Sequence, residues 1–260
     1  MSSVTYTPFL SLSQGSALVG PPRFCASPPG VASALAALPL SSAAALLLTA
    51  SPPSCHAHDA NGGGLREVPL PELPAGFEPL AASGPPPSPP QCPQPPGVLL
   101  LHSRTATLAL LLTCSSPPAL ARGALLPSPL AAFASDGLVY HHGGSLHLCG
   151  YRTPTPTRSE PAPKEPRLLA ASGDRVYLAT ADELSSFDAS DLSPANSVKL
   201  PSPAELDAEG VATPSALHAS PAAVFLSLSL RSGGDFDSRA RLFGRDLEPG
   251  EDLDNLAPCS

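Results

Sequence analysis

Residues 168–203 read LLAASGDRVYLATADELSSFDASDLSPANSVKLPSP, and this stretch decides the fold. It divides into four short runs, residues 168–174, 175–182, 183–190 and 197–203, most of them with apolar or aromatic residues and ended by Gly, Asp, Ser or Pro. Short apolar runs separated by turn residues are typical of β-strands and not of helices. Four short strands in about 40 residues form one blade of a β-propeller, so the stretch predicts such a blade.

Two motifs from this stretch recur along the chain. Ala-Ser, three variable residues, Val and an aromatic residue occur at 134–140, 171–177 and 219–225, in steps of 37 and 48 residues. Leu-Pro-Ser-Pro occurs at 126–129 and 200–203, which are 74 residues apart. Recurrence over such distances is the signature of a repeat architecture. We interpret the Ala-Ser motif as the approach to a blade and its first inner strand, with Val and the aromatic residue supplying core.

Equivalent valines and one earlier alignment extend the repeat. The valines are Val98, Val139, Val176 and Val224, spaced 41, 37 and 48 residues apart. Residues 47–71 align with residues 176–201, which adds a unit near the N-terminus. Variable spacing is expected where loops absorb insertions. We therefore count five units, of which the first two are degenerate.

The central unit resembles a known superfamily of repeats. Its sequence is DRVYLATADELSSFDAS at 174–190, followed by VKLP at 198–201. Kelch-like and quinoprotein-like (PQQ-type) propeller blades also carry a hydrophobic strand, a turn, a strand ending in Phe-Asp or Tyr-Asp, and a later Leu-Pro. The resemblance covers residues 97–246. It implies an all-β propeller of about five to six four-stranded blades, and it supplies no cofactor-binding residues.

The length of 260 residues favours one domain with a core of useful size. We expect a single propeller-like domain over residues 1–260. Within it, residues 1–96 are degenerate or partly disordered, residues 97–250 hold the clearest repeats, and residues 251–260 form an acidic tail.

Proline is concentrated in two tracts. Residues 84–96 read GPPPSPPQCPQPP and residues 154–166 read PTPTRSEPAPKEP. We interpret both as exposed loops between strands or blades, with polyproline II character in the first. The alternative is a ligand for SH3 or WW modules, because Pro86–Pro89 has PxxP spacing, although no basic anchor stands beside it.

The net charge and the hydropathy of the chain limit the classes of partner that it is expected to bind. The formal net charge is −8 and the basic residues form no stripe, so we expect no nucleic acid partner. The strongest apolar run, residues 34–50, is interrupted by Pro39, and we interpret it as two buried strands or a buried helix, not a membrane span. We expect a monomer that binds a protein partner.

The compartment is predicted from cysteine usage and from the N-terminus. The six cysteines contain no CxxC, and no secretory signal stands at the start, so reduced thiols in a cytoplasmic protein are expected. Residues 1–58 contain no acidic residue, which leaves an organelle-targeting segment as an alternative. A further alternative is that residues 9–13, which copy residues 225–229, form a strand that closes the ring.

Searches for catalytic and metal-binding patterns find little. No P-loop, GxGxxG, HExxH, GxSxG or paired CxxC is present. His56 and His58 would share one face of a strand and could bind a metal with help from His141, His142 or His147, but we favour polar residues at strand ends and turns. We expect no catalytic residue, no metal and no cofactor.

Asp59 and Asp188 occupy equivalent positions in two repeat units. Each is expected to end a strand and to set the following turn through its carboxylate. Acidic residues at 235–237 and 248–254 lack EF-hand spacing, so we interpret them as solvated rather than as a calcium site.

The sequence therefore favours a non-catalytic propeller that binds a partner protein through loops on one face. The second hypothesis is a propeller-fold hydrolase with carboxylates in a central channel. The third is a largely disordered, low-complexity chain.

Overall fold

The computed structural model describes residues 34–41, 44–50, 53–59, 66–84, 97–113, 119–135, 137–202, 211–232 and 235–253. The chain divides into a unit of residues 1–31, which lies outside this part, and a unit of residues 32–260. The described residues are all strand, turn or loop, so no helix among them is long and apolar enough to cross a membrane.

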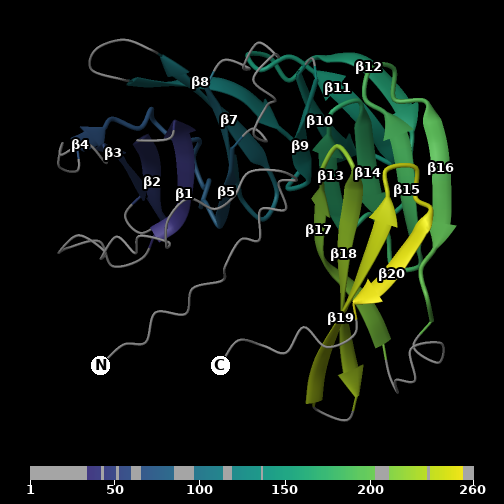
Figure 1. Ribbon diagram of the computed structural model, residues 1–260. Helices are drawn as coiled ribbons and strands as arrows, with labels where there is room; N and C mark the ends of the chain where they lie inside the picture. The colour runs from purple at the N-terminus through teal and green to yellow at the C-terminus, as the bar shows by residue number, and fades with distance from the viewer. Residues whose placement is uncertain are drawn as a thin grey trace. The chain divides into compact units, whose positions relative to one another are not determined.

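Within the described ranges, twenty strands form five antiparallel four-stranded sheets, named A to E in chain order (Figure 1). Sheet A contains β1 (Ala34–Ser41), β2 (Ala44–Ala50), β3 (Pro53–Asp59) and β4 (Arg66–Val68). Sheet B contains β5 (Ala81–Ser83), β6 (Val98–His102), β7 (Thr107–Thr113) and β8 (Ala119–Leu126). Sheet C contains β9 (Ala131–Ala134), β10 (Gly137–His142), β11 (Ser145–Cys149) and β12 (Pro156–Pro161). Sheet D contains β13 (Leu168–Ser172), β14 (Arg175–Ala179), β15 (Glu183–Asp188) and β16 (Pro194–Lys199). Sheet E contains β17 (Val211–Ala219), β18 (Ala223–Ser232), β19 (Asp235–Gly244) and β20 (Pro249–Leu253).

These five sheets are the blades of a β-propeller, as the repeat predicts. In every sheet the spatial order of the strands follows the chain order, which is the up-and-down connection of a propeller blade. The count of five units is therefore confirmed. Residues 168–199 form the four strands of sheet D almost where the punctuation by Gly, Asp, Ser and Pro places them.

The valines that mark the repeat are buried in the second strands of four sheets. Each lies in the second strand of its sheet and is 0% exposed: Val98, Val139, Val176 and Val224. Each pairs with a large apolar residue on the third strand, respectively Leu111, Leu148, Phe187 and Phe243. Val98 and Val139 pack towards the following sheet, whereas Val176 and Val224 pack towards the preceding one. The spacing of the valines thus marks the buried second strand of each blade and not a single core position.

Sheet D is buried on both of its faces. In β14, Val176, Tyr177, Leu178 and Ala179 are all 0% exposed, although successive side chains of a strand point to opposite faces. Val176 and Leu178 pack with sheet C residues such as Val139, whereas Tyr177 and Ala179 pack with sheet E. A sheet that is apolar on both faces requires a neighbour on each side.

The other sheets pack in the same chain order. Leu48, Cys55 and Val68 of sheet A lie in one cluster with Leu99 and Leu101 of sheet B. Val98 and Leu100, on the other face of β6, pack in a second cluster with sheet C residues that include Leu138 and Tyr140. Consecutive sheets therefore share their apolar side chains from A to E.

The Ala-Ser motif spans the first hairpin of a blade, so its interpretation as the approach and first strand is wrong. Ala171 and Ser172 end β13, whereas Val176 and Tyr177 lie in β14. The motif also ends β9 and β17 and continues into β10 and β18. The physical reason is that small residues suit the tight end of a strand, while the Val-aromatic pair fills the two faces of the next strand.

The tract of residues 154–166 is not wholly a loop, which corrects that prediction. Residues Pro156–Pro161 form β12, the outermost strand of sheet C. Pro156 and Pro161 stand at its two ends, where an edge strand tolerates residues that donate no hydrogen bond. The strand is mostly exposed, so the expectation of exposure is confirmed.

Three further expectations from the sequence concern the apolar run, the acidic tail and two segments that the structure does not describe. The apolar run at 34–50 forms the strand pair β1 and β2, which is the first of the two alternatives. Residues 251–253 belong to β20 and pair with β19, so the stretch expected to be an acidic tail begins within a strand. Residues 9–13 and 85–96 lie outside the described residues.

Turn chemistry recurs between the second and third strands. Gly143 and Gly144 have φ of 60° and 79° and join β10 to β11, as the two-residue hairpin signal predicts. In sheets B and D the turn is instead closed by a hydroxyl residue. The N–H of Ser103 donates to the carbonyl of Ala106 (2.8 Å), and the N–H of Thr180 donates to that of Glu183 (2.9 Å).

Replacing Leu178 with Ala is expected to lower the free energy of unfolding by about 2–5 kcal/mol, because the cavity would lie between two packed sheets. Denaturant unfolding followed by circular dichroism measures this change. The matched control is Leu80→Ala, since Leu80 is 52% exposed, and its effect is expected to stay within about 0.5 kcal/mol. Equal effects of the two substitutions would contradict the packing described.

Candidate functional site

The two ends of each sheet differ in the connections that lie there. Because the strands are antiparallel and in chain order, the turn between the second and third strands lies at the same end as the linkers to other sheets. We call this the linker end. The turns between first and second strands and between third and fourth strands lie at the opposite end, the hairpin end.

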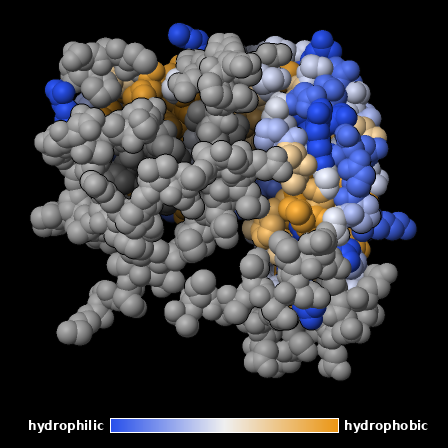
Figure 2. All heavy atoms as spheres, viewed as in Figure 1, coloured by the Kyte–Doolittle hydropathy of each residue, from blue (hydrophilic) through white to orange (hydrophobic). Residues whose placement is uncertain are grey.

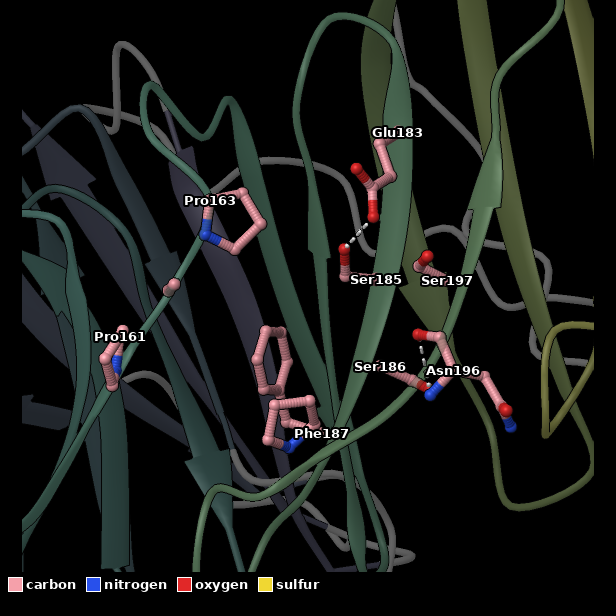
Figure 3. A pocket seen from close by; sticks show the side chains of 10 residues that line it. Pro161, Pro163, Glu183, Ser185, Ser186, Phe187, Asn196 and Ser197 are labelled. Atoms are coloured by element: carbon pink, nitrogen blue, oxygen red, sulfur yellow. Dashed lines mark hydrogen bonds between the residues drawn. The ribbon is translucent and has the colours of Figure 1, made fainter.

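A groove of about 310 Å³ runs along the outer strands of sheet D beside the end of β12 (Figure 3). Pro161 and Pro163 lie on one side of it, and Glu183, Ser185 and Phe187 lie on the other. The full lining consists of Pro161, Ala162, Pro163, Glu183, Ser185, Ser186, Phe187, Pro194, Asn196 and Ser197.

Hydroxyl groups shape the β15 side of this groove. Ser185 Oγ donates to Glu183 Oε1 at 3.0 Å. Ser186 Oγ accepts the N–H of Asn196 (3.2 Å) and donates to its carbonyl (3.3 Å), beside the register shift between Ser186 and Phe187. The Phe187 ring beneath is only 3% exposed. The groove thus combines proline rings, hydroxyls and one carboxylate over an apolar base.

The outer edge of β16 is open next to this groove. The N–H of Leu200 donates to the Asp182 carbonyl at 2.8 Å, and hydrogen-bonded pairs recur at every second residue of an antiparallel ladder. The N–H and C=O groups of Ser197 and Lys199 therefore point away from β15. β16 ends its sheet, so no strand of sheet D pairs with that edge.

Figure 2 shows hydrophilic side chains gathered on the side where Figure 1 draws β12 and β16. Residues in both strands are mostly exposed. Charged and proline residues on an edge strand discourage pairing with unselected strands. The edge is thus solvated and open to a suitable extended segment.

A second polar cluster lies at the linker end of sheet B. His102, at the end of β6, places Nε2 at 2.9 Å from Ser83 Oγ of β5. Its Nδ1 lies 3.2 Å from Thr107 Oγ1 and 3.3 Å from the Pro129 carbonyl. The hydroxyl of Thr107, which is 0% exposed, donates to the Ser128 carbonyl at 2.8 Å.

Burial lowers the pKa of His102 below its usual value of 6.5, and the hydrogen bond to Pro129 opposes this shift in part. The groups that contact the ring, Ser83, Thr107 and Pro129, are uncharged. The imidazole is therefore neutral at physiological pH.

The hairpin ends of sheets D and E are joined by charge pairs. Arg175 contacts Asp246 at 3.0 Å and Asp188 at 3.9 Å, and Arg245 contacts Asp174. Burial raises the pKa of Tyr177 to about 12, so its hydroxyl stays protonated, and it donates to the Arg245 carbonyl at 2.9 Å. These contacts connect two neighbouring blades and give no ligand site.

The histidines named from sequence do not converge. His56 bonds to Ser54 within β3, and the side chain of His58 lies outside the described part. His147 Nε2 donates to the carbonyl of His142 at 3.0 Å, and its Nδ1 lies 2.7 Å from Ser159 Oγ. Among the residues that the structure describes, no group of three or more metal-ligating side chains is found.

The structural role predicted for the repeated aspartate is confirmed at Asp188. This residue ends β15, and its carboxylate accepts the N–H (2.8 Å) and the hydroxyl (2.6 Å) of Ser190. These hydrogen bonds lower its pKa. Asp59 ends β3 at the equivalent place, but its side chain is not in the described part.

The two cysteines within the described ranges, Cys55 and Cys149, are buried and free. Burial raises the pKa of each thiol to about 11, so both remain protonated. They act as small core residues.

Sequence reasoning missed Ser83 and His102. No motif flags them, because they are 19 residues apart and meet only through the pairing of β5 with β6. A usable signal lies in the repeat itself. In sheet D, which aligns best with the repeat, the equivalent residues are the apolar Ala170 and Ala179.

Comparison with known proteins identifies the fold and no family. No protein-family model matches the sequence, and a search of curated proteins finds no match. The WD40 domain of Pan2 from Neurospora crassa has a TM-score of 0.51 at 9% identity, with 85% of this chain and 65% of that chain covered. The N-terminal domain of Nup159 has a TM-score of 0.50 at 12% identity, with 80% and 57% covered.

Both similar structures are β-propellers, which agrees with the five blades described above. This chain spans only part of their length. The resemblance to kelch-like or PQQ-type repeats in particular finds no support beyond the shared propeller fold.

Lowering the pH is expected to destabilise the protein through His102, and His102→Asn is expected to reduce that loss. The folded-state pKa lies below the unfolded value of 6.5, so the unfolded chain takes up the proton first as the pH falls. The contribution is therefore complete above the unfolded pKa and declines as the pH falls through it. Unfolding midpoints measured between about pH 5 and 8 test this.

The comparison for that measurement is His141→Asn, since burial lowers the pKa of His141 as well. Each single variant should remove part of the pH dependence and the double variant more. A wild-type slope in His102→Asn would show that His102 does not titrate as described.

Proposed function

We propose that this chain is a protein-interaction propeller that binds an extended segment of a partner protein along β16, with side chains of that segment entering the adjoining groove. The observation that supports this most is the open backbone edge at Ser197 and Lys199 beside the groove. Strand addition to an open edge uses backbone hydrogen bonds for affinity and neighbouring pockets for specificity.

The chemistry of the groove fits a mixed segment rather than a strongly apolar one. Its apolar lining comes from proline rings over the nearly buried Phe187, and its polar lining comes from Asn196, Ser197 and the Glu183 carboxylate. Apolar or proline residues would contact the rings, and a basic residue would pair with Glu183. The groove reaches the linker end, which agrees with binding through loops on one face.

The hypothesis of a hydrolase that uses carboxylates in a central channel has less support. The carboxylates whose pKa is clearly lowered, Asp188 and Asp191, accept hydrogen bonds from the turn residues Ser190 and Ser193. Both therefore have structural partners at the hairpin end. A monomeric state, a cytoplasmic location and the lack of nucleic acid binding stay predictions from sequence.

Selection of a displayed library of random peptides against the purified protein tests the proposal. We expect peptides whose affinity, measured by fluorescence anisotropy, falls by at least about tenfold in Asn196→Arg, because the new side chain would fill the groove. The same loss is expected in Ser197→Pro, which removes one outward N–H from the edge.

The matched control is Thr155→Arg, an exposed residue outside the groove, which should leave affinity unchanged. Circular dichroism checks that each variant is folded. Selection of no peptide, or equal affinity for wild type and Asn196→Arg, would refute binding at this groove.

A further inference from the structure

Sheets B and D share one backbone framework but differ at three facing positions. The N–H of Leu80 donates to the His102 carbonyl, as the N–H of Arg167 does to the Ala179 carbonyl, each at 2.8 Å. Ser83 pairs across from Leu100, as Ala170 does from Tyr177. The two sheets can therefore be compared residue by residue.

In this comparison, three polar residues of sheet B replace three apolar ones. Ser83, His102 and Thr107 stand where sheet D has, in the same order, Ala170, Ala179 and Leu184. A polar group placed in a core position is unfavourable unless it is hydrogen-bonded. Sheet D shows that the fold tolerates apolar residues at all three places, so folding alone does not demand the polar set.

The positions of the protons follow from the hydrogen bonds. The Thr107 hydroxyl donates to the Ser128 carbonyl, so its oxygen faces His102 as an acceptor. The Pro129 carbonyl is also an acceptor. Nδ1 of His102 must then carry the proton, and Nε2 presents a lone pair to the Ser83 hydroxyl at 2.9 Å.

This arrangement is that of a serine nucleophile beside a general base. The pattern consists of a nucleophile within about 2.6–3.2 Å of a base that a third group orients. Here Thr107 and Pro129 orient the base through Nδ1, and the Leu-Pro-Ser-Pro motif at 126–129 supplies the carbonyl groups.

The pair is accessible, and an exposed apolar residue precedes β5 in the chain. Ser83 and His102 are half-buried, so each keeps part of its surface open to solvent. Leu80, bonded through its N–H to the His102 carbonyl, is 52% exposed and is the one large apolar residue so exposed among those described. An uncharged, apolar acyl group suits these uncharged surroundings of Ser83 and His102.

We propose that Ser83 and His102 form an acyl-transfer site for uncharged carboxylic esters. Ser83 Oγ attacks the ester carbonyl carbon, its proton passes to Nε2 of His102, and the C–O bond to the alcohol breaks as the alcohol takes that proton. Water then attacks the acyl-serine with His102 as base, which releases the carboxylic acid and restores the Ser83 hydroxyl. This activity is independent of peptide binding at β16.

The chain contains an internal comparison in Ser159 and His147. Their contact is 2.7 Å, and Nε2 of His147 donates to the His142 carbonyl. Ser159 is exposed on an edge strand, so water competes for its hydroxyl and for the base. Burial of His102, by contrast, lowers the pKa of its imidazole. Ser159 is therefore the control serine.

The test treats the full-length protein with a fluorophosphonate, which forms a P–O bond to an activated serine as the P–F bond breaks. Peptide mass mapping should find the label on Ser83 and not on Ser159. Hydrolysis of p-nitrophenyl butyrate should be detectable in the wild type and in Ser159→Ala. Both signals should be lost in Ser83→Ala.

The role of the histidine is tested by rate and by pH. His102→Asn should slow labelling of Ser83 by about 100-fold or more, as expected for removal of a general base. In the wild type, the labelling rate should rise with pH and reach half its maximum below 6.5, since burial lowers the pKa of His102. Thr107→Val, which removes the group that orients the ring, should slow labelling without changing the reagent's access to Ser83.

A triple variant that carries the sheet D residues serves as a folded control without the proposed site. Ser83→Ala, His102→Ala and Thr107→Leu together give sheet B the apolar set that sheet D already packs. It should remain folded by circular dichroism, bind β16 peptides as the wild type does, and lack esterase activity. Absence of label on Ser83, or labelling that His102→Asn leaves unchanged, would overturn the proposal.

Discussion

The burial of the second strands of sheets B, C and D on both faces is the constraint on which this structure depends. Four consecutive residues of β14 are fully buried, and they contact different sheets on alternate sides. A single four-stranded sheet of this kind would leave one apolar face in water. Sheets B, C and D are therefore stable only between neighbours, and the repeat is a consequence of packing before it is a sign of function.

This constraint determines where polar groups that could bind or react can lie. The inner strands are committed to apolar contacts, which leaves the outer strands, the turns and the linkers for polar groups. The groove beside β16 arises at an outer edge, where no further strand of sheet D covers the backbone. The cluster around His102 arises at a linker end, where carbonyl groups of Ser128 and Pro129 are free to accept hydrogen bonds.

The sequence was sufficient for the fold because the fold depends on local punctuation and on a recurring core residue. Val98, Val139, Val176 and Val224 mark equivalent strands although aromatic residues are few. The sequence was insufficient where contacts between distant residues determine the local structure. The proline tract at 154–166 reads as a loop, yet pairing with β11 makes part of it a strand. The contact between Ser83 and His102 depends on strand register, which no local pattern reveals.

The joints between neighbouring sheets differ in a way that bears on binding. Sheets D and E are connected at the hairpin end by two charge pairs and by the Tyr177 hydroxyl. Sheets C and D share an apolar cluster, but beside their outer strands lies the groove lined by Pro161, Pro163 and Phe187. Where the charged groups between two sheets already pair with one another, few of them are left to bind another molecule. Where the outer part of the contact between two sheets is open, next to an edge with which no strand of sheet D pairs, a partner protein can supply further contacts.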